Sequence, residues 1–160
     1  MSTTRNFEEL PVWKEARKLT KGIYEASKTK PFYFDKGLVD QITRASVSVM
    51  SNIAEGIERG TTKELIYFLF IAKGSVGEVR CQLYVAEDQG YISRENAEVM
   101  RCTARQISCQ LNSWIKALQA SDTPRGPQYN KQKSKADKSY DDGRKWMEQH
   151  LKKIEAERKE

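Results

Sequence analysis

Four apolar seams with helical spacing constrain this 160-residue chain more than any other feature of its sequence. Apolar residues three or four positions apart lie on one face of an α-helix, so each seam predicts a helix with one buried side. The predicted helices cover residues 11–28, 36–59, 62–89 and 94–118. Because short connectors join antiparallel neighbours, we expect an all-α protomer, an up-down-up-down four-helix bundle over residues 8–120.

Residues with special backbone or capping properties mark the ends of these helices. Pro11 suits a first helical turn, whereas Pro31 lacks the N–H that the first helix would need in order to continue. Gly60 suits the position after a helix C-terminus, and Gly56 lies on the second seam, where a larger side chain would hold two helices apart. N-caps are expected at Asp35, Thr61 and Ser93.

The composition changes abruptly after Ala120. A linker containing Pro and Gly is followed by a polar, lysine-rich stretch with too little apolar content to fold alone. The last part of the chain carries apolar side chains on one side of a short helix, which docks either on its own bundle or on a partner. The predicted parts are therefore a bundle over 1–120, a basic linker over 121–140 and a short amphipathic helix over 141–158.

The chain is poor in the residues that most catalytic and metal sites need. Its three cysteines, Cys81, Cys102 and Cys109, form no CxxC pair, and its one histidine is His150. This scarcity disfavours a zinc ribbon, a disulfide framework and a Ser-His or Cys-His nucleophile. We expect no enzymatic activity, no metal and no cofactor. No apolar run reaches the roughly 18 residues of a membrane span, and the N-terminus lacks a signal-peptide core, so we expect a cytoplasmic protein.

The third predicted helix has more apolar surface than one bundle can bury. Residues 65–72 are apolar all the way round, whereas a helix in an isolated bundle needs one apolar stripe. Exposing Tyr67, Phe70 and Ile71 together would give a monomer a large apolar patch, so we expect these residues to contact another copy of the chain. Gly74 and Gly77, further along the same helix, are expected to allow close helix packing.

A ladder of polar residues follows the second seam at spacings of three and four. The ladder comprises Asp40, Arg44, Ser48, Asn52, Glu55 and Arg59. One interpretation is a solvated face with ion pairs between residues four apart. The alternative is a face that hydrogen-bonds to a neighbouring helix or subunit. A hydrolase using Glu55 with Glu78 is a third interpretation, which nothing in the spacing requires.

Basic residues are the most plausible functional feature of the sequence. The net charge of +6 favours polyanionic partners. The candidate phosphate-binding residues lie on the first helix, on the fourth helix and in the linker: Lys14, Arg17, Lys18, Lys21, Arg94, Arg101, Arg105, Lys131, Lys133, Lys135 and Lys138. Such contacts weaken steeply with salt. The alternative is ordinary solubilising charge.

Several ordered motifs within about residues 5–118 resemble a known family. They read FxxLxVWxxA from Phe7, GLxDQIxRA from Gly37, SNIAEGxxR from Ser51 and FLxIAxGSxxExxxxL from Phe68, followed by Gly90 and Tyr91. The chain resembles the four-helix bundle proteins encoded in intervening sequences of bacterial 23S ribosomal RNA. That family also includes the accessory variability determinant, Avd, of diversity-generating retroelements.

The resemblance implies a fold, an assembly and two alternative functions. It implies a homopentameric ring of four-helix protomers with a basic surface. In the retroelement branch, the ring binds a reverse transcriptase and template RNA and promotes cDNA synthesis without chemistry of its own. The alternative is a scaffold or assembly protein from a ribosomal intervening sequence. The matching motif residues, assigned to fold and assembly, are Asp40, Gln41, Arg44, Asn52, Glu55, Gly56 and Arg59. The extension after Ala120 departs from the pattern and suggests an added RNA or protein contact.

Overall fold

The structure, a computed structural model, describes residues 6–121. Over this range the chain is all-α, and the predicted four-helix bundle is confirmed. The long helices are α1 (Pro11–Ser27), α2 (Lys36–Glu58), α3 (Thr62–Asp88) and α4 (Arg94–Gln119), and each predicted boundary is within about two residues of the observed one. Two short 3-10 helices, η1 (Phe7–Glu9) and η2 (Phe32–Phe34), precede α1 and α2.

The predicted N-caps begin three of these helices. The side chains of Asp35, Thr61 and Ser93 each accept a hydrogen bond from the backbone N–H three residues later, at 3.0, 3.2 and 3.2 Å. These bonds satisfy backbone donors that a helix start leaves unpaired. Gly60 has a φ of 73° in the turn between α2 and α3, a backbone conformation that glycine adopts without strain. Local sequence signals therefore set where the helices begin.

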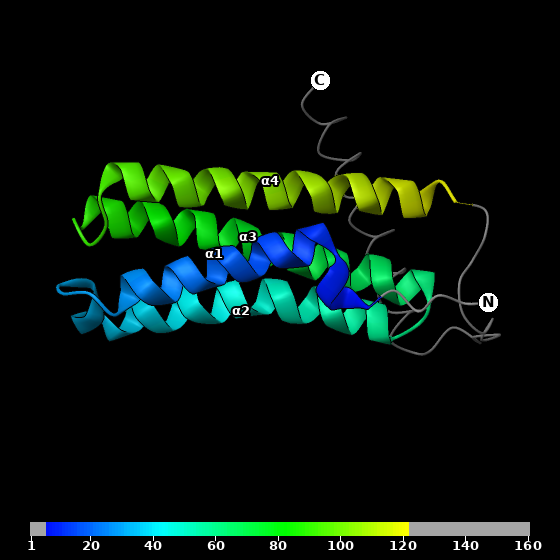
Figure 1. Cartoon of the computed structure of the whole chain (residues 1–160), viewed down its shortest axis with the longest axis horizontal. Coiled ribbons are helices and arrows are strands. Elements are labelled where there is room, and N and C mark those ends of the chain that lie inside the picture. The colour runs from blue at the N-terminus through cyan, green and yellow to red at the C-terminus, as the bar shows by residue number, and fades with distance from the viewer. Residues whose placement is uncertain (1–5, 122–160) are drawn as a thin grey trace, which may run out of the picture. The chain divides into compact units, whose positions relative to one another are not determined.

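The helices run alternately up and down, and each packs against its neighbours in the chain (Figure 1). Contacts between α1 and α4 close the arrangement, while α2 and α3 pack most extensively. The seams meet in one core whose most deeply buried side chains include Ile42, Ile53, Leu69, Ile107 and Leu111. A second row of partly buried residues, among them Met100, Trp114 and Leu118, covers this core.

Close packing between α2 and α3 depends on Gly56. A Cβ atom at this position would lie 3.1 Å from Leu65 Cδ1 and 3.1 Å from Phe68 Cβ. Both distances are tighter than ordinary van der Waals contact. The geometry is consistent with the prediction that a larger side chain at Gly56 would hold two helices apart, which the variants described in the Discussion test.

No helix within residues 6–121 is long and apolar enough to cross a membrane. The predicted basic linker beyond Ser121 and the predicted helix over 141–158 lie outside the described residues. Of the candidate phosphate-binding residues, Lys131, Lys133, Lys135 and Lys138 lie there too.

Candidate nucleic-acid interface

The outward side of α1 presents a row of cations. Lys14, Arg17, Lys18 and Lys21 are all exposed, whereas Val12, Ala16, Leu19 and Ile23 on the opposite side are buried in the core. The Arg17 guanidinium lies 5.8 Å from the ring centroid of Trp13, and Lys21 Nζ lies 3.7 Å from Glu25 Oε1. Both side chains of the Lys21–Glu25 pair are well exposed, so the pair adds little stability and leaves Lys21 available to another anion.

Lys18 and Lys21 lie at the rim of an open groove between α1 and α4. Leu19, Val99 and Met100 supply its apolar lining, and Gly22 leaves room on the α1 side. Val99 is 67% exposed. The groove therefore combines two lysines, the carboxylate of Glu25 and an apolar lining.

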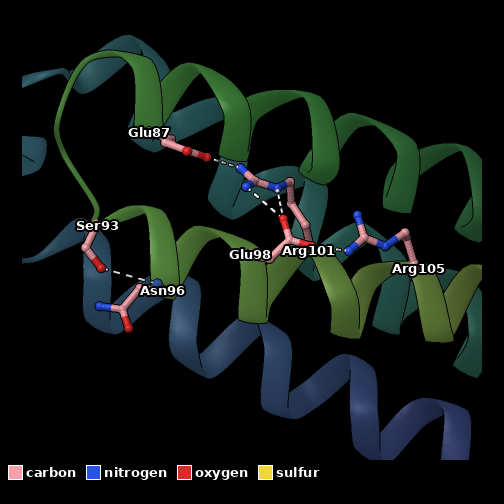
Figure 2. A network of polar contacts seen from close by, with 6 residues as sticks. All are labelled: Glu87, Ser93, Asn96, Glu98, Arg101 and Arg105. Atoms are coloured by element: carbon pink, nitrogen blue, oxygen red, sulfur yellow. Dashed lines mark hydrogen bonds and ion pairs between the residues drawn. The ribbon is translucent and has the colours of Figure 1, made fainter.

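The fourth helix departs from the sequence prediction at Arg101. Its side chain is only 4% exposed, and its guanidinium donates to Glu87 at the end of α3 and to Glu98 on α4, with Nη2 2.9 Å from Glu98 Oε2 (Figure 2). The guanidinium carbon also lies 4.1 Å from the ring centroid of Tyr84. Arg101 is therefore a buried tie between α3 and α4, and the prediction that it contacts phosphate is wrong.

The ion pairs around Arg101 are reflected in its pKa and that of Glu98. Burial lowers the pKa of Arg101, but the hydrogen bonds to Glu87 and Glu98 outweigh it, so the pKa is raised overall. The pKa of Glu98 is lowered, first by its hydrogen bond from Arg105 and then by that from Arg101. Arg101 and Glu98 are thus both held in their charged forms. The Arg105 guanidinium also donates a hydrogen bond to Glu98. Arg94, the other candidate on α4, is exposed at the start of the helix.

The outward side of α3 carries exposed apolar residues at spacings of three, four, three and seven. We name this set the α3 outer stripe: Tyr67, Phe70, Gly74, Gly77 and Tyr84. Tyr67 is 61% exposed and Phe70 49%, whereas Ile71 is partly buried. No atom lies within 4 Å of where a Cβ would stand at Gly74 or Gly77, so these glycines do not serve close packing inside the protomer.

Comparison with known proteins places this geometry in a family. The model of the 23S rRNA-intervening sequence protein family matches residues 8–113, which cover all of α1, α2 and α3 and most of α4. The chain belongs to this family. A crystal structure of a protein of unknown function from the S23 ribosomal protein family of Bacteroides thetaiotaomicron is similar in fold, with a TM-score of 0.61 and 24% identity. The match covers 66% of this chain and 98% of that one. Among curated proteins, no sequence matches this chain.

In this member of the family, the polar ladder on α2 forms local pairs, and its Ser48 is linked to α3. Asp40 pairs with Arg44, with 3.6 Å between the carboxylate and the guanidinium. Asn52 donates to the Ser48 carbonyl at 2.7 Å and to the Ser48 hydroxyl at 3.0 Å. The Ser48 hydroxyl lies 2.9 Å from that of Ser75 on α3. Asn52 therefore orients a serine pair that joins the two helices.

The end of the ladder fixes the turn between α2 and α3. Arg59 Nη2 lies 2.7 Å from Glu55 Oε1, and Nη1 lies 3.8 Å from Glu64 Oε1 on α3. The guanidinium also lies 5.4 Å from the ring centroid of Phe68. The hydrogen bond from Arg59 to Glu55 raises the pKa of Arg59. In the family member described here, this part of the motif stabilises the fold of the protomer.

Glu55 and Glu78 do not form a carboxylate pair. Glu55 accepts two hydrogen bonds from Arg59, whereas Glu78 lines an open polar groove with Asp40 and Arg44, about three helical turns away along α2. Within residues 6–121 there is also no cluster of three His, Cys, Asp or Glu side chains that could hold a metal. The geometry thus gives the hydrolase interpretation no support.

Sequence reasoning missed an exposed aromatic pair in η2. Phe34 is 64% exposed and Tyr33 48%, while the adjacent Phe32 is buried. The run Phe-Tyr-Phe between lysines was the available signal, but a connector is normally judged by its turn residues and not by its apolar ones.

Proposed function

We propose that this chain is a non-enzymatic, homo-oligomeric scaffold that binds RNA along the basic side of α1. The observation that carries the proposal is the exposure of Lys14, Arg17, Lys18 and Lys21 on one side of one helix. Phosphate contacts supply most of the affinity of a protein that binds RNA without reading its sequence. Oligomerisation would repeat this basic side several times in one particle and raise the avidity for a long polyanion.

The α3 outer stripe supports the homo-oligomer. An exposed apolar row on a helix is a typical helix-packing surface between subunits. The two glycines cost about 1 kcal/mol each in helix propensity. Inside the protomer, no atom lies within 4 Å of their Cβ positions. A second copy of the helix approaching closely at Gly74 and Gly77, between Tyr67 and Tyr84, would account for both the glycines and the aromatic residues. The homopentamer is the form that the family resemblance implies.

Removing charge from α1 tests the RNA contact. The K14Q/K18Q variant should bind RNA more weakly, and its slope of log affinity against log salt should fall by about 1.4, since each lost phosphate contact on a single strand removes about 0.7. Fluorescence anisotropy with a labelled RNA over a salt series measures both. The matched control is K63Q/K116Q, which removes the same charge from exposed lysines on α3 and α4. Equal losses in the two variants, or no binding by the wild type at moderate salt, would refute the proposal.

Charge on the α3 outer stripe tests the oligomer. Phe70→Glu should convert the oligomer to monomer, because it places a carboxylate in the proposed interface, and native mass spectrometry reads the subunit number directly. Val99→Glu is the control, since Val99 is an apolar residue on α4 that is even more exposed than Phe70. A wild-type monomer, or an F70E variant with the wild-type subunit number, would contradict the assignment of this stripe.

The narrower proposal is an accessory subunit of a diversity-generating retroelement. Such a subunit binds the reverse transcriptase, template RNA and the cDNA made from it. The second candidate is a scaffold encoded in a 23S rRNA intervening sequence. The name of the matching family, 23S rRNA-intervening sequence protein, favours this candidate. Co-purification of a reverse transcriptase encoded beside this gene supports the first candidate. Location of the gene within a 23S rRNA gene supports the second.

A further inference from the structure

The connector between α1 and α2 holds two aromatic rings outward on a rigid base. Phe32 is buried and stacks on Tyr91, with ring centroids 5.2 Å apart and planes 17° apart. Asp35 caps α2 and accepts a hydrogen bond of 3.2 Å from the Tyr91 hydroxyl. Backbone hydrogen bonds from Tyr33 to Thr29 and from Phe34 to Pro31 complete the turn. The exposure of Tyr33 and Phe34 is therefore built into the fold.

One lysine side chain lies against each of these two rings. Lys36 Nζ lies 3.2 Å from the ring centroid of Tyr33, and Lys30 Nζ lies 5.5 Å from that of Phe34. Lys28, at the end of α1, is exposed as well. The one carboxylate in this connector, Asp35, is engaged by the α2 N-terminus and by Tyr91. Exposed rings and cations in one place suit a ligand that combines flat apolar faces with negative charge.

The basic side of α1 leads directly to this connector. Lys14, Lys18 and Lys21 share one side of α1, together with Glu25, which pairs with Lys21, and Lys28 follows the last residue of the helix on the same side. At 1.5 Å per residue they span about 21 Å along the helix axis. A nucleic-acid strand whose phosphates follow these lysines would arrive at the connector, where η2 carries Tyr33 and Phe34.

We infer that Tyr33 and Phe34 form a stacking platform for unpaired bases of RNA, flanked by Lys30 and Lys36. The inference rests on the proposed function, to which it adds the kind of RNA that is bound. Bases within a duplex are stacked on one another and offer no free face, whereas unpaired bases stack readily on exposed aromatic side chains. The platform therefore selects single strands, loops or ends over duplex.

The test compares one unstructured RNA 20-mer, fluorescently labelled, with the same strand in a duplex. The Y33A/F34A variant should bind the single strand about 10-fold or more weakly, since stacking contributes roughly 1–3 kcal/mol per base, and should bind the duplex as the wild type does. The control variant Y33F/F34Y keeps both rings and should match the wild type on both probes. Photocross-linking of a 4-thiouridine RNA should map to the peptide that contains Tyr33 and Phe34.

The possible failures are distinguishable from one another. Wild-type binding with no loss in Y33A/F34A overturns the platform and leaves the proposed function standing. A wild type that binds neither probe overturns both. A changed subunit number in Y33A/F34A assigns the two rings to a contact between copies and also overturns the platform. Circular dichroism checks that the variants keep their helices, which exposed substitutions should preserve.

Discussion

Replacing Glu87 and Glu98 together by glutamine is expected to lower the free energy of unfolding by about 3 kcal/mol. The substitution leaves the Arg101 guanidinium, which is only 4% exposed, without either carboxylate. An uncompensated buried charge costs more than the loss of a surface ion pair. Urea titration followed by circular dichroism measures the difference, with a shift in Tm on the order of 10 °C as a second readout.

The matched variant is Arg101→Met, which removes the charge and keeps an apolar stem against Tyr84. It should cost clearly less, because Glu87 and Glu98 are more exposed than Arg101 and regain water. An R101M variant that is less stable than E87Q/E98Q would contradict a dominant desolvation cost.

The same pair of variants predicts a pH dependence. The folded-state pKa of Glu98 lies below its ordinary value, so its stabilising effect is complete above the unfolded pKa and is lost as the pH falls through the folded pKa. The stability gap between the wild type and E87Q/E98Q should therefore narrow from about pH 5 downward. Urea titrations at a series of pH values measure this difference in stability. A difference that does not change with pH would contradict the lowered pKa of Glu98.

Gly56→Leu is expected to destabilise the bundle by about 3 kcal/mol, the upper end of the cost of overpacking. Even the first atom of the new side chain would lie 3.1 Å from both Leu65 and Phe68, so α2 and α3 would have to separate. Because these two helices pack more extensively than any other pair, the separation would disturb the largest contact in the protomer. Chemical denaturation of the variant against the wild type measures the cost.

A pair of alanine variants isolates the clash from helix propensity. Gly22→Ala gains up to about 1 kcal/mol of propensity and meets only Met100 Cε, at an ordinary 3.5 Å. Gly56→Ala gains the same propensity but meets Leu65 and Phe68. G56A should therefore be less stable than G22A. Equal stability of G56A and G22A would show that Leu65 and Phe68 on α3 can move aside without loss of stability.

Much of the fold was predictable from sequence because its signals are local. Periodic apolar seams, three N-caps and two glycine positions act within a few residues of chain, and they determined the helices and their order. The excess of apolar residues on α3 likewise predicted that the protomer would not bury Tyr67 and Phe70. The four basic residues on α1 were predictable too, since their spacing alone places them opposite the buried seam.

Tertiary structure decided which charges and aromatic rings face solvent. On sequence alone Arg101 and Arg94 were equivalent, but folding placed Arg101 between α3 and α4, beside a carboxylate 14 residues earlier in the chain. Phe32 and Phe34 are chemically identical, yet only Phe32 meets Tyr91, 59 residues away. Sequence periodicity determines which side of a helix is apolar, whereas the partner of an individual side chain depends on contacts between distant segments. The sequence by itself therefore determined the bundle, and only the tertiary structure separated a buried arginine from an exposed one and a core ring from an exposed one.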